Sequence, residues 1–456
     1  MKQLLIYNIG LLLVDNHHKP FLAGREMAEA DIIHDAWLLV EDGRFKEWGL
    51  MSDVPFTPSV QGDLQSPYQI ENRKSVNRKS LDAHGGAVLP SFCDSHTHLV
   101  YAESREGEFV DKIQGLSYAE IARRGGGILN SADRLHAMSE DDLYSQAMVR
   151  IREIIKKGTG AVEIKSGYGL NTDDELKMLR VIQRIKETTP LRVVSTFLGA
   201  HAVGRGYTQE QYVDLVVNEM ILEVARQHLA DFIDVFCDDG FFTPAETHRI
   251  LEAGLKYGLR GKIHGQELAD SGGVDVAVAC GALSVDHLES MTDKDIELLT
   301  PTNLPPRGRL SARKYSEAKA SPSGGGWWGR GPTIPTALPG TSFFLNMPFA
   351  PARKMIDSGL PVALASDYNP GSTPSGDMKF VVSLACIKQR LLPVEAIHAA
   401  TLNSACAMGL SHDYGSIAKG KVANFFITDP IPSLDFLPYA YTTPLIKQVF
   451  LSGQEI

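Results

Sequence analysis

The chain has 456 residues, of which 43% are hydrophobic and 22% are charged, and its formal net charge at pH 7 is -10. This length allows one large domain and a smaller one, and the acidic balance argues against a nucleic-acid or anionic-membrane partner. A local cationic pocket for an acidic small molecule remains compatible with it, so we expect a small-molecule substrate.

The first apolar segment, MKQLLIYNIGLLLVDN, is interrupted by Asn8 and Gly10 and ends near Asp15. It lacks a small-residue cleavage site, so it predicts strands and no signal peptide. No run reaches the roughly 18 apolar residues of a membrane span. The five cysteines form no C-x-x-C pair. We therefore expect a cytoplasmic protein with reduced thiols and no disulfide framework.

Both ends of the chain are predicted to form one small β-sandwich domain, made of residues 1–86 and 415–456. Short strand patterns with turns occur in both parts, for example DAWLLVEDGRFKEWG and GSIAKGKVANFFITD. The polar stretch from Pro55 to Ser80 predicts a surface loop within this domain.

Residues 87–414 are predicted to form a (β/α)8 barrel of the TIM type. From Ala87 to about Pro370, short β-branched runs alternate with helical patterns such as DDELKMLRVIQRIKETT. Eight runs can form the barrel strands: AVLPSFCDSH, TGAVEIKSGYG, LRVVSTFLGAH, DFIDVFCDDG, LRGKIHGQE, ALSVDHLE, TIPTALPGTS and LPVALASDYNPG.

Metal-binding side chains come where predicted strands end in polar turns, at His96, His98, His264 and Asp367. The carboxyl ends of barrel strands form the active-site face, and residues two apart on a strand point to the same side. An H-x-H pair alone is equally compatible with two surface histidines. Three imidazoles and a carboxylate suit zinc or ferrous iron, and such an ion can lower the pKa of a bound water to roughly 7. The four together favour one metal-hydrolase site.

Further polar residues fall at the same strand ends, namely Tyr168, His201, Glu267, His287 and Asn369. Each has an ordinary alternative: Tyr168 can be a turn aromatic, His201 a loop histidine, and His287 a buried hydrogen-bonded one. Glu267 follows His264 by three residues, where it can move a proton between water and a leaving nitrogen. As a group they favour an active site.

The motifs resemble those of the amidohydrolase superfamily, with H-T-H on the first strand, His264 on the fifth, His287 on the sixth and Asp367 on the eighth. More narrowly, the chain is similar to the imidazolonepropionase family. The stretches that carry this similarity include SHTHLVYAESREGEFVDKIQGLSY, RRGGGILNSADR, EIKSGYGLNTDDELKMLRVI, KIHGQEL and ARKMIDSGLPVALASDYNPGS.

The resemblance implies hydrolysis of the ring C–N amide bond of 4-imidazolone-5-propanoate to N-formimidoyl-L-glutamate, a step of histidine degradation. It also implies one zinc or iron ion per chain and a homodimer. The fourth strand, DFIDVFCDDG, offers no lysine that could hold a second metal. Lys165 lies on the second strand instead, so we expect it to have an orienting or structural role.

Substrate contacts are also implied by the resemblance. Arg105 is expected to bind the propanoate group through its planar fork, although an ordinary surface ion pair would explain it too. His201 is expected to polarise the ring carbonyl. The full implied substrate-binding set is Arg105, Tyr168, His201, Glu267, Asn369, Gly371 and Ser372.

Three catalytic roles follow in addition to that of His201. Glu267 is the expected general acid and base. His287 is expected to lie beside the metal and to orient the attacking hydroxide, while Asp367 binds the metal and also accepts a proton.

Two other functions use the same ligand pattern. A mononuclear deaminase would share the metal ligands, and the substrate-facing residues Arg105, KSGYG, GAH and SDYNPGS separate it from the first interpretation. A non-catalytic scaffold is the second alternative, and the intact ligands and Glu267 argue against it.

The sequence departs from the family pattern at two places. Ser91 stands where glycine is expected in the turn before H-T-H. The larger departure is the Pro-, Gly- and Ser-rich segment at about residues 301–332, which predicts a disordered surface insertion on the face opposite the active site. An error in the sequence itself is the alternative explanation.

Overall fold

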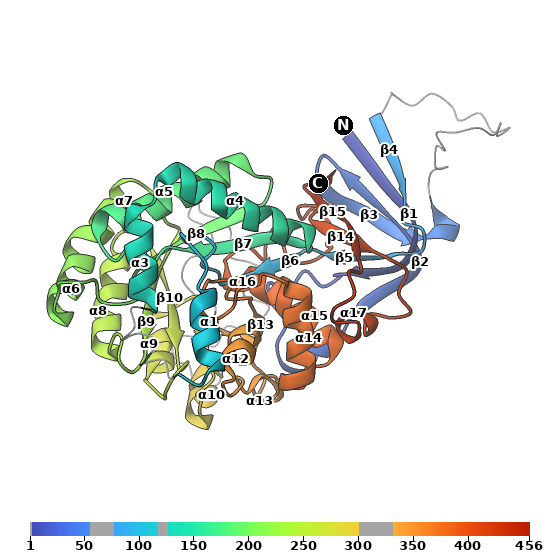
Figure 1. Ribbon diagram of the computed structural model, residues 1–456. Coiled ribbons are helices and arrows are strands. Elements are labelled where there is room, and N and C mark those ends of the chain that lie inside the picture. The colour runs from blue at the N-terminus through green and yellow to red at the C-terminus, as the bar shows by residue number, and fades with distance from the viewer. Residues whose placement is uncertain (1, 55–76, 117–119, 121–125, 301–331) are drawn as a thin grey trace.

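The computed structural model describes residues 2–54, 77–116, 120, 126–300 and 332–456. Its strands form two separate sheets, and Figure 1 shows the barrel on the left and the second sheet, which contains both chain ends, on the right. This arrangement confirms the predicted fold class of a TIM-type barrel with a small sandwich domain. The exact division at residues 86 and 415 stays a prediction.

The barrel sheet has eight parallel strands that follow one another in chain order. Hydrogen bonds from the Asp367 N–H to the His96 carbonyl (3.0 Å) and from the His98 N–H to the Tyr368 carbonyl (2.9 Å) link its first and last strands. The ring of strands is therefore nearly closed. The strands are β6 (Phe92–Asp94), β7 (Thr159–Lys165), β8 (Arg192–Ala200), β9 (Phe232–Cys237), β10 (Arg260–Gly265), β11 (Ser284–His287), β12 (Ile334–Ala337) and β13 (Ala363–Leu364).

Helices surround this ring (Figure 1). Helix α5 illustrates why the sequence folds this way: the Asn171 side chain accepts a hydrogen bond from the Asp174 N–H, and Leu179 and Ile182 lie on the buried face. The other long helices are α4 (Glu140–Lys156), α8 (Pro244–Leu255), α14 (Met378–Gln389) and α3 (Ile128–Ala137), and α5 itself spans Thr172–Thr188. The shorter ones are α1 (Glu106–Ile113), α6 (Gln209–Leu215), α7 (Ile221–Arg226), α9 (Gly273–Cys280), α10 (Asp293–Leu299), α12 (Pro339–Leu345), α13 (Ala352–Asp357), α15 (Pro393–His398), α16 (Ser404–Ala407) and α17 (Phe436–Tyr439).

The second sheet combines strands from the two ends of the chain. Its order is β16-β15-β14-β5-β1-β2-β3, and β4 pairs with β1. Leu12, Val88, Phe425 and Phe450 belong to its own buried core. The strands are β1 (Lys2–Val14), β2 (Asp31–Glu41), β3 (Arg44–Leu50), β4 (Asn77–Asp82), β5 (Ala87–Pro90), β14 (Phe425–Thr428), β15 (Ile446–Leu451) and β16 (Gln454–Glu455).

The predicted strand that starts at Ala87 is divided between the two sheets. Residues 87–90 form β5, which pairs with β1 and β14, while residues 92–94 form β6 of the barrel. Ser91 lies at the crossing and donates its N–H to the Asn424 carbonyl at 3.1 Å. Both neighbouring strands therefore form with serine at this turn.

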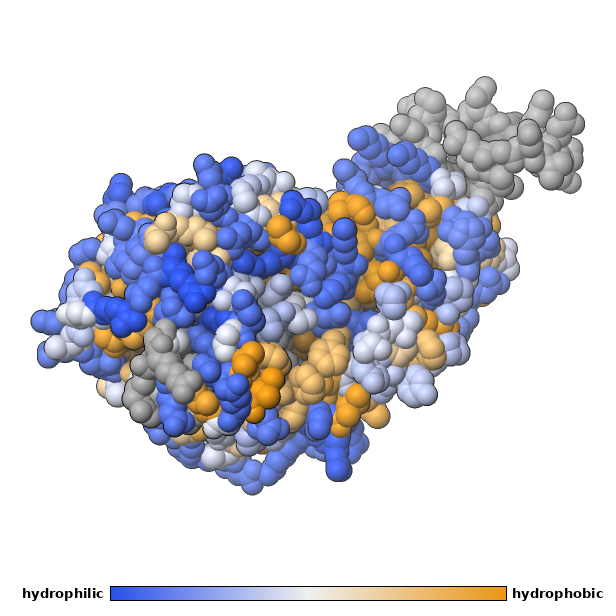
Figure 2. Space-filling model, in the orientation of Figure 1, coloured by the Kyte–Doolittle hydropathy of each residue, from blue (hydrophilic) through white to orange (hydrophobic). Residues whose placement is uncertain are grey.

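Two predicted irregular segments fall largely outside the described residues. Of the predicted loop from Pro55 to Ser80, residues 77–80 are described, and there the prediction is wrong because they begin β4 and pair in parallel with β1. The segment at 301–332 also lies outside the described residues, apart from its last residue. In the described ranges no helix is long and apolar enough to cross a membrane, and the face in Figure 2 is mostly hydrophilic.

Candidate metal centre and active site

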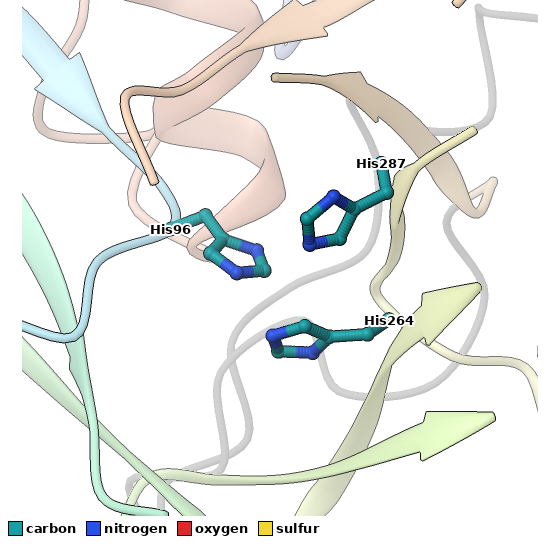
Figure 3. A group of neighbouring side chains, drawn as sticks. All are labelled: His96, His264 and His287. Atoms are coloured by element: carbon teal, nitrogen blue, oxygen red, sulfur yellow. The ribbon is translucent and has the colours of Figure 1, made fainter. Parts of the chain in front are cut away.

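Three histidines from different barrel strands point toward one another (Figure 3). His96 follows β6, His264 lies in β10, and His287 ends β11. The ring centroid of His96 is 4.3 Å from that of His264 and 5.3 Å from that of His287, and all three side chains are buried. The carboxyl ends of the strands thus meet at one point, as the strand positions predicted.

His98 and Asp367 complete the cluster. The His98 Nε2 atom is 3.4 Å from the His264 Nε2 atom, and the Asp367 Oδ1 atom is 3.5 Å from His98 Nε2 and 3.7 Å from His96 Nε2. The other oxygen of Asp367 accepts a hydrogen bond from the Thr341 hydroxyl at 2.6 Å. Ligand atoms of three overlapping groups lie within 4.8 Å of one another here: His96, His98 and Asp367 form one, and His264 joins either His98 and His201 or His96 and His287 in the others. The four predicted ligands thus lie in one cluster, and the exact ligand set stays a prediction.

Two buried carboxylates orient the imidazoles. The Asp286 Oδ2 atom is 2.7 Å from His96 Nδ1, and the Asp234 Oδ2 atom is 3.0 Å from His264 Nδ1. An N–H at Nδ1 that faces a carboxylate leaves the lone pair of Nε2 available in the cluster. Burial lowers the pKa of His264 to about 3 and that of His96 well below its usual value, so both rings are neutral at pH 7.

The residues present fit a transition-metal ion. Within the described residues the buried Nε2 atom of His96 has no hydrogen-bond partner, although its lone pair points into the cluster. Burial, followed by the neighbouring His201, keeps the pKa of His98 well below its usual value, so this ligand is neutral as well. Neutral imidazole nitrogens and a carboxylate oxygen are donors suited to zinc or ferrous iron. These donors support one mononuclear site.

Beneath this cluster the barrel interior holds five fully buried charged side chains, from Glu163, Lys165, Asp234, Lys262 and Asp286. The Lys165 ammonium lies 2.7 Å from Asp234 and 2.8 Å from Glu163, and it remains 3.8 Å from Asp286. Lys262 pairs with Glu163 and donates to the Ser95 carbonyl at 2.9 Å. Although burial alone would lower it, Asp234 and Glu163 keep the pKa of Lys165 raised. The two lysines thus hold in place the carboxylates that orient His96 and His264.

These supporting carboxylates were missed by the sequence interpretation. Asp234 and Asp286 stand within buried strands, in FIDVFC and SVDH. Charged residues are almost never fully buried unless they are paired, so their presence in such strands was the available signal. Lys165 lies buried among these carboxylates, and the orienting or structural role expected for it stays a prediction.

Glu267 lies at the edge of the cluster of predicted metal ligands. Its Oε2 atom is 3.5 Å from the Nε2 atom of His287, whose other nitrogen is 3.7 Å from Glu289. Burial raises the pKa of Glu267 to about 7. Although burial alone would lower it, Glu267 and Glu289 raise the pKa of His287 to about 10. A carboxyl group that titrates near neutral pH suits a general acid and base.

Some strained backbone positions lie at the same strand ends. Non-glycine residues in the left-handed region include Gln266 (φ 52°), His287 (φ 84°), Leu288 (φ 71°) and Asp367 (φ 55°). Each such conformation costs of order 1–3 kcal/mol, and strained residues cluster where a site must hold side chains in set positions. The chain therefore bends sharply at the ends of β10, β11 and β13, where His287 and Asp367 face the cluster.

Arg105 precedes α1 and lies against the turn after β13. Its Nη2 atom is 2.5 Å from Glu108, and a Cβ atom added to Gly371 would lie 2.3 Å from its Nη1 atom. Lys112 donates to the Gly371 carbonyl at 2.9 Å. The structure thus brings two predicted substrate residues, Arg105 and Gly371, into contact. Lys112 and Glu108 were not among the predicted site residues, and both lie on α1.

Tyr168 and His201 lie beside His98. The His98 and His201 rings stack with centroids 5.1 Å apart, and the Tyr168 ring is 5.9 Å from the His98 ring. The Nδ1 atom of His201 lies 2.9 Å from the Gly167 carbonyl, to which its N–H donates. Burial lowers the pKa of His201 to about 4. The neutral ring therefore presents an acceptor at Nε2.

Asn369 and Ser372 shape the turn after β13. The Asn369 side-chain oxygen accepts from the N–H groups of Gly371 (2.7 Å) and Ser372 (2.8 Å), and its amide donates to the Asp367 carbonyl (2.8 Å). The Ser372 hydroxyl donates to Asp367 at 3.2 Å. These contacts fold the turn around the predicted ligand, and a substrate contact by Asn369 and Ser372 stays a prediction.

Comparisons with known proteins agree with this geometry. The model of the amidohydrolase family matches residues 87–456. The chain is 48% identical to the imidazolonepropionase of Christiangramia forsetii, over 99% of this chain and 100% of that protein. It is 47% identical to the imidazolonepropionase of Flavobacterium psychrophilum, over the full length of both.

Solved structures share the fold at low identity. An adenosine deaminase from Xanthomonas campestris with bound zinc is 15% identical with a TM-score of 0.66, over 99% of this chain and 92% of that one. Guanine deaminase from E. coli is 13% identical with a TM-score of 0.67, over 100% of this chain and 98% of that one. These likenesses support the architecture alone.

Proposed function

Because the chain belongs to the amidohydrolase family, and within it to the imidazolonepropionases, we propose how its residues open the ring of 4-imidazolone-5-propanoate. It is a hydrolase that acts on a cyclic amide C–N bond and produces N-formimidoyl-L-glutamate in histidine degradation. Its substrate is a small molecule. The roles of individual residues, the identity of the metal, a homodimeric assembly and a cytoplasmic location are parts of the proposal.

His96, His98, His264 and Asp367 would hold one zinc or iron ion. When bound, the ion supplies a Lewis acid and lowers the pKa of a coordinated water to roughly 7. Asp234 and Asp286 keep the lone pairs of His264 and His96 directed at it. Asp367 also has its second oxygen fixed by Thr341, so its first oxygen is held toward the histidines.

Glu267 moves the proton. It accepts one from the water that attacks the amide carbon, and it returns that proton to the ring nitrogen as the C–N bond breaks. The oxygen of the water stays on the carbonyl carbon, which becomes a carboxylate. His287, 3.5 Å from Glu267, orients this carboxyl group and the attacking water, and Asp367 is a second acceptor for the proton.

The substrate is held at its two ends. Arg105 binds the propanoate through its guanidinium, whose position Glu108 and Gly371 fix. His201 and Tyr168 contact the imidazolone ring beside His98. The Nδ1–H of His201 donates to the Gly167 carbonyl, so only its Nε2 atom can face the substrate. If Nε2 also carries a proton, it can polarise the carbonyl of the imidazolone ring. If it does not, it accepts a hydrogen bond from an N–H of that ring. Asn369, Gly371 and Ser372 bind the substrate or the formimidoyl product.

The observation that carries the proposal is the convergence of three neutral imidazole nitrogens and the Asp367 oxygen beside a carboxyl group whose pKa is raised to about 7. Freshly generated imidazolone propanoate would be followed by its ultraviolet absorbance with the purified, metal-analysed protein. We expect about one metal per chain and turnover that Glu267→Gln reduces by about 100-fold or more.

Two controls separate the roles. Glu252→Gln removes an exposed carboxylate from α8 and should leave turnover unchanged. Arg105→Ala should weaken substrate binding with a smaller effect on kcat. If metal-replete wild-type protein leaves imidazolone propanoate intact, the substrate assignment fails, and a panel of amino-substituted purines and triazines tests the deaminase alternative.

A further inference from the structure

A buried aspartate outside the metal cluster accepts four backbone hydrogen bonds. Asp238 follows β9 directly and is 4% exposed. Its Oδ2 atom accepts from the N–H groups of Glu267 (2.8 Å) and Leu268 (2.9 Å), and its Oδ1 atom accepts from those of Ala269 (3.2 Å) and Asp239 (2.8 Å). Three of these four donors belong to the turn after β10, so one side chain from β9 fixes the neighbouring turn.

Besides Asp238, the turn is held through Gln266, whose carbonyl accepts from the Ser290 N–H at 2.7 Å. It begins with Gln266 in the left-handed region at φ 52°, a conformation that an L-residue adopts only under constraint. A further tie between the turn and β9 is the Ser271 hydroxyl, which donates to the Cys237 carbonyl at 2.9 Å. Glu267 follows Gln266 directly, so the direction of its side chain depends on how the backbone is held at these residues.

Only an ionised carboxylate satisfies this set of donors. A carboxylate offers about four acceptor positions and no donor, whereas an asparagine would direct an NH2 group at N–H groups. Hydrogen bonds to an ionised acceptor are also the stronger ones. We propose that Asp238 is a positioning residue that holds Glu267 in reach of the reacting atoms through the backbone of the turn.

This inference rests on the proposed role of Glu267. Asp238 is not expected to touch the substrate, so its loss should lower kcat while KM and metal content stay close to those of the wild type. Asp238→Asn replaces one acceptor oxygen with an NH2 group, which repels the N–H groups of the turn. We therefore expect it to reduce kcat by about 30-fold. Asp238→Glu keeps the charge but moves the carboxylate by one methylene, and we expect a loss of about tenfold.

The matched control is Asp239→Asn. This neighbouring aspartate is exposed, and its replacement removes the same charge from the same loop. It should leave kcat within twofold of the wild type. If Asp239→Asn lowers kcat as much as Asp238→Asn does, the loss comes from the charge of the loop and the proposal is overturned.

A double-mutant cycle with Glu267→Gln tests whether Asp238 acts through Glu267. In the Glu267→Gln background, Asp238→Asn should lower the residual kcat by less than twofold, because the group that it positions is already gone. A full 30-fold loss in that background, or an unchanged kcat for the Asp238 single variants, overturns the proposal. Thermal melting shows whether each variant is folded. If Asp238→Asn proves to be unfolded, the same cycle is measured with Asp238→Glu in its place.

Failure of the proposed function has a different signature. If the function is wrong, wild-type protein does not turn over imidazolone propanoate, or Glu267→Gln leaves kcat unchanged. If only the role of Asp238 is wrong, both of those results are as expected and the Asp238 variants alone deviate.

Discussion

Replacing Gly371 with alanine should disable substrate binding without unfolding the protein. A Cβ atom at this position would lie 2.3 Å from the Nη1 atom and 2.6 Å from the Cζ atom of Arg105. Carbon contacts are favourable at about 3.5–4.0 Å, so the guanidinium has to move by about 1 Å. Because its 2.5 Å pairing with the buried Glu108 resists this movement, the fork no longer matches the position of a carboxylate.

The size of the effect follows from the contact that is lost. A hydrogen bond to a charged group contributes about 1.5–3 kcal/mol, which corresponds to a change in kcat/KM of roughly 10- to 150-fold. We expect this loss in the ultraviolet assay, mainly through KM. Gly371 does not have a positive φ, so the alanine adds no backbone strain, and the melting temperature should change by only a few degrees.

Gly107→Ala is the matched control, since this glycine lies on α1 next to Glu108 and an added Cβ atom would meet nothing within 4 Å. It should keep kcat/KM within twofold of the wild type. Arg105→Ala/Gly371→Ala should be no worse than Arg105→Ala alone. A Gly371→Ala enzyme with normal kcat/KM would show that Arg105 does not bind the propanoate from the described position.

Three further outcomes are expected. Lys165→Met should lower the free energy of unfolding by about 3–5 kcal/mol in urea titrations, since it leaves buried carboxylates uncompensated, whereas the exposed Lys294→Met should change it by less than about 0.5 kcal/mol. An equal effect of both would refute the buried network. In metal-free protein, the raised pKa of Glu267, about 7, means that its neutral form contributes stability below its unfolded pKa and that this contribution is lost as pH rises through 7. Glu267→Gln should therefore raise the melting temperature more at pH 8.5 than at pH 5, and equal shifts at both pH values would contradict this sign. Adding zinc to chelator-treated wild-type protein at about 1,000 times the Kd should raise the free energy of unfolding by about 4 kcal/mol. The same gain in His98→Ala at the same zinc concentration would show that His98 is not a ligand.

The parts of the site that were predictable lie at strand ends. The H-T-H pair and Asp367 each follow an apolar run, and His264 lies near the end of a predicted strand, where those residue types have few structural reasons to stand. The fold makes all such positions meet on one face, so the sequence order was enough to bring them together. The eight strand candidates all correspond to observed barrel strands, although the first also supplies β5.

The supporting residues depend on contacts between strands far apart in the chain. Asp286 bonds a histidine 190 positions away, and Asp238 bonds a turn about 30 positions away. Asp238 has the sequence signature of an ordinary turn residue, so nothing in the sequence separates it from Asp239. The pairing of Arg105 with Glu108 was within reach, because a residue at the start of a helix lies close to the residue three positions on, but its contact with Gly371 required the fold.

The position of β5 has a consequence for synthesis of the chain on the ribosome. β5 lies between β1 and β14, and β14 is more than 330 residues further along the chain. While the barrel is being synthesised, one edge of β5 has no strand to pair with, and unpaired edges recruit other chains. Nascent chains that are stalled before residue 425 should therefore be prone to aggregation or bound by chaperones, even when every metal ligand has already emerged.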